Sequence, residues 1–155
     1  MDKGMSEIVK GISKIVFPFI ILFGIALVLY GHINPGGGFS GGVVLAGGFV
    51  LLLLAFGKDY VFKVFPPKIA RLIDSLGALG FLCIAVLGFT GGHFFYNFLN
   101  KGRLFHLWSG GTMVFANIAI GMKICSALFV GISVLSMARL EKKENGPIYR
   151  QSGEE

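Results

Sequence analysis

The sequence predicts an all-α integral membrane protein with four transmembrane helices and both termini in the cytoplasm. Hydrophobic residues make up 54% of its 155 residues and charged residues 14%, a balance that soluble domains seldom reach. A membrane-spanning helix needs roughly 20 mostly apolar residues. Four such stretches occur, at about residues 12–30, 39–56, 72–90 and 113–138. The third observation, which sets the orientation, is where the basic residues lie.

Basic residues are distributed very unequally between the two sides of the predicted membrane. Eleven lie before the first stretch, between the second and third, or after the fourth, and two lie in the other connections. The eleven are Lys3, Lys10, Lys14, Lys58, Lys63, Lys68, Arg71, Arg139, Lys142, Lys143 and Arg150, and the two are Lys101 and Arg103. Since basic loops stay in the cytoplasm, this pattern predicts a multi-pass cell-membrane protein with cytoplasmic termini. The net charge of +6 then reflects a face beside anionic lipid and does not indicate nucleic acid binding. We expect one transmembrane domain over residues 1–140 and a cytoplasmic tail over 141–155.

The first stretch follows a segment that alternates basic and apolar residues. Residues 3–14 have the pattern of an interfacial helix that leads into the first span. Pro18 lies near the start of this span, and two interpretations stay open: within the helix it removes one hydrogen bond and bends it, whereas in the first turn it is harmless.

A glycine-rich connection precedes the second stretch. Residues 31–42 are half glycine, and irregular backbone of this kind must contact water or protein because it cannot face lipid. Gly38, Gly42 and Ala46 follow at intervals of four, a spacing that lets another helix approach closely. We therefore expect a tight outer turn and an outer half of this helix that is buried against protein. The third stretch repeats the pattern with Gly77, Gly80 and Gly88.

Lys123 is the most unusual residue of the fourth stretch. It lies about 24 Å from Arg139 at the cytoplasmic end, and burying its ammonium costs at least ~2.5 kcal/mol. Small residues share its helix face, which predicts a tight protein contact and not lipid exposure; they are Ala116, Ala119, Ala127 and Gly131. Two interpretations stay open: a structural partner of one buried carboxylate, or part of a path for protons or cations.

Asp74 is the only acid in the four stretches. It follows Arg71 by about 5 Å along the helix axis, so we expect it at the cytoplasmic edge, as an interfacial residue or a partner of Arg71. Lys123 is expected to be much deeper, so direct pairing between Lys123 and Asp74 is not predicted. The lysine would then be neutral through desolvation, or its counter-charge would come from another subunit. Na⁺ prefers oxygen ligands, which Asn117 or Asp74 could supply.

Histidines and cysteines complete the candidate groups. His32, His93 and His106 all fall on the predicted outer side, where they could relay protons or act only as polar anchors. Cys83 and Cys125 lie inside predicted helices and are expected to be buried thiols. No catalytic motif is present, and we expect no catalytic residue, cofactor or resident metal. Haem binding is disfavoured because no pair of axial ligands projects from facing helices.

Two segments carry a resemblance to a known family. The first is the motif formed by Gly31, His32, Pro35, Gly36, Gly37, Gly38, Phe39, Gly41 and Gly42. The second, less specific, runs from Asn117 to Lys123. Together they resemble the B subunit, of MnhB or MrpB type, of multisubunit sodium/proton antiporters. The same subunit type occurs in the antiporter-like modules of membrane-bound hydrogenases and related complexes.

The resemblance implies a small subunit that packs among other membrane subunits and contributes to assembly and to Na⁺ and H⁺ translocation. It would not be catalytic by itself, although it could belong to an ion-translocating oxidoreductase complex whose redox chemistry lies elsewhere. The alternative is a purely structural packing subunit without ion contact. The candidate residues of an ion path are Lys123, His32, Asp74, Asn117 and His106.

Overall fold

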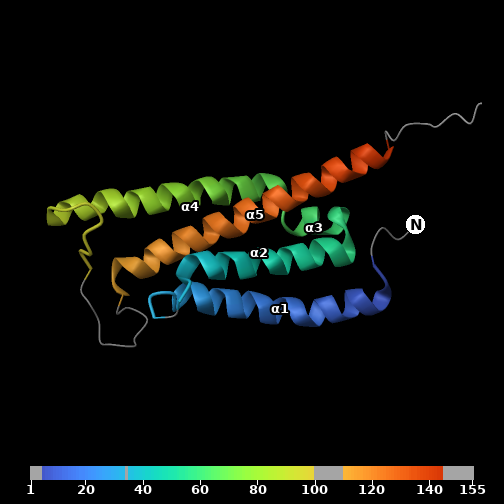
Figure 1. Ribbon diagram of the computed structural model, residues 1–155, viewed down its shortest axis with the longest axis horizontal. Coiled ribbons are helices and arrows are strands. Elements are labelled where there is room, and N and C mark those ends of the chain that lie inside the picture. The colour runs from blue at the N-terminus through green and yellow to red at the C-terminus, as the bar shows by residue number, and fades with distance from the viewer. Residues whose placement is uncertain (1–4, 34, 100–109, 145–155) are drawn as a thin grey trace, which may run out of the picture.

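The computed structural model describes residues 5–33, 35–99 and 110–144, and these ranges contain helices and no strand (Figure 1). The helices are α1 (Glu7–Leu29), α2 (Gly37–Phe56), α3 (Lys58–Val64), α4 (Pro67–Leu87), the short 3-10 helix η1 (Gly88–Gly91) and α5 (Thr112–Glu144). Helices α1, α2, α4 with η1, and α5 are long and apolar enough to cross a membrane. The all-α fold and the four spans are therefore confirmed, while the cytoplasmic location of the termini stays a prediction.

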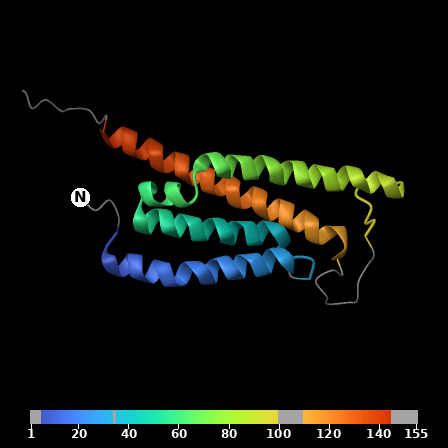
Figure 2. The ribbon, with the colours of Figure 1, turned by 180° about the vertical axis from the view of Figure 1, so that it is seen from behind.

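The four long helices lie side by side in the order α1, α2, α5, α4 (Figures 1 and 2). Helix α5 thus packs between α2 and α4. The start of α1, the short helix α3 and the end of α5 lie at one end of the bundle, which we call the α3 end. The turn between α1 and α2 and the segment after α4 lie at the opposite end, the glycine-turn end.

Helix α1 begins earlier than predicted, at Glu7. The segment expected to form an interfacial helix that leads into the span is continuous with it, and an ion pair of 2.9 Å between Lys10 Nζ and Glu7 Oε1 joins two residues of its first turn. Pro18 consequently lies in the middle of α1, which contradicts the interpretation as a harmless first-turn proline and agrees with the alternative of a proline within the helix. At this position it removes one backbone hydrogen bond from the helix.

The short helix α3 was not predicted, and it changes where α4 begins. The chain turns at Gly57, whose φ of 80° suits glycine, and Val61 of α3 then packs fully buried in the core. Just beyond α3, the Phe65 ring stacks on Phe49 of α2 at 4.8 Å and meets Phe129 of α5 edge-on at 5.1 Å. Phe49 lies seven residues, or about 10 Å, before the end of α2. Helix α4 therefore starts beside the middle of its neighbours and not level with their ends.

Asn97 fixes the start of α5. Its Oδ1 accepts hydrogen bonds from the Thr112 backbone N–H and the Thr112 hydroxyl, both at 3.1 Å. Its Nδ2 donates to the Gly110 carbonyl at 3.4 Å. An amide from the segment after α4 thus satisfies an N-terminal N–H of α5 that has no partner within the helix. At its other end, α5 continues to Glu144, beyond the predicted limit at residue 138.

Candidate functional site

Lys123 and Asp74 form an ion pair between α5 and α4. Lys123 Nζ lies 2.9 Å from Asp74 Oδ1 and donates a hydrogen bond to it. The expectation that these residues do not pair is therefore wrong. Within the described residues, Asp74 shows no ion pair with Arg71, which was its expected partner.

The displaced start of α4 explains the pairing. Asp74 lies seven residues, about 10 Å, after Pro67 along α4. Lys123 lies six residues, about 9 Å, before Phe129, whose ring contacts Phe65 just ahead of α4. Helices α4 and α5 run in opposite directions (Figure 1). The two offsets therefore bring the side chains of Asp74 and Lys123 to the same level.

Gly77 lets the two helices approach closely enough for this contact. A Cβ atom added at Gly77 would lie 2.8 Å from the Ala119 carbonyl oxygen and 3.0 Å from the Lys123 backbone nitrogen. Gly80 has more room, since its Cβ would lie 3.8 Å from the Ala119 Cβ. The predicted packing role of Gly77 is confirmed, and Asp74, one turn earlier, lies within reach of Lys123.

The ion pair lies near the middle of the apolar length of α5. Lys123 comes eleven residues after Thr112 and thirteen before Ser136, the ends of the apolar span, or about 16 and 20 Å away. Asp74 is level with it along the bundle and lies about 10 Å after the start of α4, while its place relative to the membrane surface stays a prediction. The Lys123 side chain is 44% exposed and that of Asp74 34%, so one side of the pair is open in the single chain.

The small residues that share a face with Lys123 differ in their surroundings. Ala116 and Ala119, toward the glycine-turn end, are buried. Ala127 and Gly131, toward the α3 end, are exposed. The predicted tight contact is thus confirmed within the chain only for the first two residues.

The glycine-rich turn and Asn117 form a second cluster. A Cβ atom at Gly31 would lie 2.8 Å from Asn117 Nδ2, and one at Gly37 would lie 3.2 Å from Asn117 Oδ1. At Gly38 the nearest atoms would be the backbone O, C and Cα of Asn117. Gly36 has a φ of 105°, which is a further reason for glycine in this turn. Asn117 therefore packs closely against the glycine-rich turn, in agreement with the prediction of a tight turn.

Glycines of α2 continue this close packing toward the bundle centre. A Cβ atom at Gly41 would lie 2.9 Å from the Val28 nitrogen of α1, and one at Gly42 would lie 2.8 Å from the Gly121 carbonyl oxygen of α5. Both glycines are buried, as is Ala46. The prediction that the outer half of this helix is buried against protein is confirmed.

The predicted histidine cluster is only partly placed. The His32 side chain packs against Gly110, where an added Cβ atom would lie 3.0 Å from the His32 Cβ and Cγ. His93 is exposed. His106 lies outside the described residues, so a cluster of the three stays a prediction. Asn117 and Lys123 are six residues apart on α5, about 9 Å, and therefore belong to separate groups.

The two cysteines do not behave alike. Cys125 is buried, as predicted, whereas Cys83 is exposed, so the prediction of a buried thiol at that position is wrong for the single chain.

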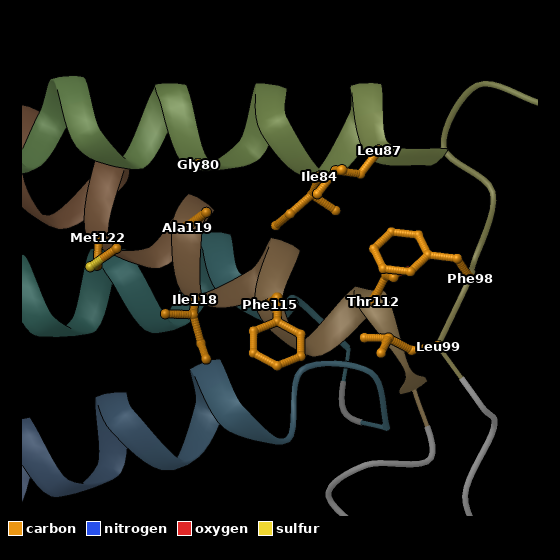
Figure 3. A pocket seen from close by; sticks show the side chains of 10 residues that line it. All are labelled: Gly80, Ile84, Leu87, Phe98, Leu99, Thr112, Phe115, Ile118, Ala119 and Met122. Atoms are coloured by element: carbon orange, nitrogen blue, oxygen red, sulfur yellow. The ribbon is translucent and has the colours of Figure 1, made fainter. Parts of the chain in front are cut away.

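An apolar groove lies beside the contact between α4 and α5 (Figure 3). It has a volume of about 430 Å³, and Thr112 is the one lining residue with a polar side chain. On α5 it is lined by Phe115, Ile118 and Met122. Lys123 follows Met122 and so projects about 100° further round the helix. The groove thus lacks the charged groups that an ion path needs, and the ion pair lies outside it.

Comparisons with known proteins agree on one family. The family described as "Domain related to MnhB subunit of Na+/H+ antiporter" matches residues 8–130. An uncharacterized protein of Methanocaldococcus jannaschii is 35% identical, over 89% of this chain and 56% of the relative. A Staphylococcus saprophyticus protein named "Putative antiporter subunit mnhB2" is 39% identical, over 57% of this chain and 63% of the relative.

A solved structure is also similar to this chain. It is a chain of the membrane-bound sulfane sulfur reductase, described as an archaeal respiratory membrane complex, with a TM-score of 0.71 and 28% identity. The match covers 87% of the present chain and 60% of that chain. The present chain thus spans less than two thirds of the length of each of these three proteins.

Proposed function

The chain belongs to the family of domains related to the MnhB subunit of Na⁺/H⁺ antiporters, and we propose that it is a small, non-catalytic membrane subunit that contributes to Na⁺ and H⁺ translocation and to assembly. The assembly is a free-standing Mrp-type antiporter or the antiporter module of a membrane-bound hydrogenase-type respiratory complex. The name of the Staphylococcus relative supports the first setting, and the likeness to a chain of an archaeal respiratory membrane complex supports the second.

The observation that carries the proposal is the ion pair of Lys123 and Asp74, which joins the middle of the α5 span to a residue about 10 Å into the α4 span. Charged groups at this depth are expensive, and those that occur in membrane proteins commonly mark ion and proton pathways. A structural contact between α4 and α5 alone does not require charge, since apolar residues and glycines already pack these helices.

The pair has the chemistry to exchange one cation for another. Na⁺ prefers oxygen ligands and would compete with the Lys123 ammonium for the Asp74 carboxylate. When Na⁺ neutralises the carboxylate, the ammonium loses the charge that stabilises it, and it releases a proton to become a neutral amine. One Na⁺ is bound and one H⁺ is released, so the net charge of the site is unchanged. The reverse step binds a proton and releases Na⁺.

Other oxygen ligands would have to complete a Na⁺ site. Within the described residues, no three side chains of His, Cys, Asp or Glu gather closely enough to hold a metal ion. We therefore assign the remaining ligands to water, backbone carbonyls or neighbouring subunits. Asn117 and His32 would contribute polar contacts at the glycine-turn end of the path, and His106 remains a candidate on the sequence alone.

We further propose that the α3 end of the bundle faces the cytoplasm. Lys10, Lys58 and Lys63 lie on helices at this end, and the basic residues of the connections are concentrated here. The positive-inside rule then puts the glycine turn on the outer side.

Replacing Lys123 in the assembled complex tests the proposal. In inverted membrane vesicles that contain the complex, Lys123→Ala is expected to depress Na⁺-dependent proton movement while the subunits still co-purify. Lys68→Ala, which removes an exposed lysine from the start of α4, is the matched control and is expected to retain exchange. Unchanged exchange in Lys123→Ala, or loss of the complex, would contradict a role in translocation.

The second candidate is a structural subunit without ion contact. The close packing of Gly38 and Gly42 against α5 supports this alternative, because it ties α2 to the central helix. In this case Gly42→Leu would be the damaging substitution, and the loss of exchange would follow the loss of assembly.

A further inference from the structure

We propose that the face of α4 and α5 that carries the ion pair is the docking site for a membrane-spanning helix of a neighbouring subunit, and that this helix presents a carboxylate to Lys123. This ion-pair face consists of Arg71, Asp74 and Ala78 on α4 and of Lys123, Ala127 and Gly131 on α5. The inference rests on the proposed place of the chain in a multisubunit assembly.

The exposure of the ion pair requires a cover other than lipid. Lys123, near the middle of the α5 span, is 44% exposed, and Asp74 beside it is 34% exposed. An ammonium has three N–H donors, and in the described part of the chain one hydrogen bond, to Asp74, is seen. Hydrocarbon offers no acceptor for the remaining donors, and an unsatisfied polar group in the bilayer core is costly. The ends of the apolar span are about 16 and 20 Å away, too far for the side chain to reach the headgroups.

The charges on the face indicate an acidic partner. Arg71 and Lys123 are positive and Asp74 is negative, which leaves an excess of one positive charge. Arg71 is exposed, and among the described residues it forms no ion pair with a carboxylate. A neighbouring helix with one Asp or Glu would balance this charge and accept hydrogen bonds from the ammonium.

The shape of the face also suits a helix. Ala78 lies four residues after Asp74, and Ala127 and Gly131 lie four and eight residues after Lys123, so these small residues share the face of the ion pair. All three are exposed, and a Cβ atom added at Gly131 would meet no other atom within 4 Å. Small side chains allow a second backbone to approach closely enough for its side chain to reach the pair.

Photo-crosslinking in the complete complex tests the inference. Val134, a larger residue that lies three positions after Gly131 on α5 and is 57% exposed, is replaced by p-benzoyl-phenylalanine, the complex is irradiated in native membranes, and crosslinked peptides are identified by mass spectrometry. The expected product joins position 134 to a membrane-spanning segment of another subunit that contains Asp or Glu. The same probe at Phe19, which is 71% exposed on α1 at the other side of the bundle, should not yield this peptide. Lipid adducts alone, or a peptide without an acid in its spanning segment, would overturn the proposal.

A packing variant provides an independent measurement. Gly131→Leu is expected to reduce co-purification of the crosslinked subunit at least fivefold, because the larger side chain occupies the space of the docked helix. Gly11→Leu is the matched control, since a Cβ atom at Gly11 also meets nothing within 4 Å but lies on α1. Equal retention of the subunit by both variants would contradict docking on this face.

These outcomes are separate from those of the transport assay. If the crosslink forms and Lys123→Ala leaves exchange unchanged, the docking site stands and the translocation role is wrong. If exchange is lost in Lys123→Ala but position 134 reacts only with lipid, the translocation role stands and the docking site is wrong.

Discussion

Gly38→Ala is predicted to separate α2 from α5 at the glycine turn. The added methyl group would meet three backbone atoms of Asn117, with its C and Cα both at 2.9 Å. A comfortable contact needs about 3.6 Å, so the helices must move apart by roughly 0.7 Å. No side-chain rotation can relieve the overlap, because the atoms involved belong to the backbone of α5. Overpacking of this kind costs about 1–3 kcal/mol.

The assay is thermal unfolding of the purified complex in detergent, followed by circular dichroism. Gly38→Ala should lower the melting temperature, and Gly47→Ala is the matched control on the same helix. A Cβ atom at Gly47 meets nothing within 4 Å, so this variant should be neutral, or more stable by up to about 1 kcal/mol through its higher helix propensity. Equal melting temperatures for Gly38→Ala and the unmodified protein would refute the close contact between the turn and Asn117.

Three further predictions concern other contacts. Asn97→Ala should destabilise the start of α5 by about 1 kcal/mol, because the Thr112 backbone N–H loses its acceptor. Asn97→Asp keeps a side-chain oxygen and should retain most of the stability, and the rate of hydrogen exchange at the Thr112 amide measures the effect of each variant. Phe129→Ala should cost about 3–5 kcal/mol in the free energy of unfolding, because the ring is fully buried against Phe49 and Phe65, whereas Phe19→Ala on an exposed surface should cost far less. Lys123→Met or Asp74→Asn alone should destabilise the complex more than the two together, with a coupling of roughly 0.5–3 kcal/mol in a double-mutant cycle; additive effects would show that the pair contributes no interaction energy.

The sequence predicts the spans well because lipid imposes a simple rule of length and hydrophobicity on each helix. It also predicts the contacts of Gly38 and Gly42, since small residues four apart mark a close helix approach in a membrane. Both predictions depend on local pattern, and the four apolar helices and buried glycines of the structure agree with them.

The pairing of Lys123 with Asp74 could not be obtained in this way. Counting residues from Arg71 placed Asp74 at the membrane edge, on the assumption that α4 begins where α2 ends. The short helix α3 and the stacking of Phe65 on Phe49 contradict this assumption. They place the start of α4 about 10 Å from the end of α2, toward the middle of the bundle. The signal in the sequence was the apolar and aromatic content of the connection, where Val61, Phe62 and Phe65 are too hydrophobic for a solvated loop.

Removing both charges of the ion pair tests the central claim most directly. The double variant Lys123→Met, Asp74→Asn removes both charges of the pair, and Arg71 remains on the same face to balance the carboxylate of the docked helix, so the complex is expected to assemble. Na⁺-dependent proton movement in inverted vesicles should nevertheless fall to the level of vesicles without the complex, because no group remains that can exchange Na⁺ for H⁺. An assembled double variant with unreduced exchange would contradict the account and leave the pair with a structural role only.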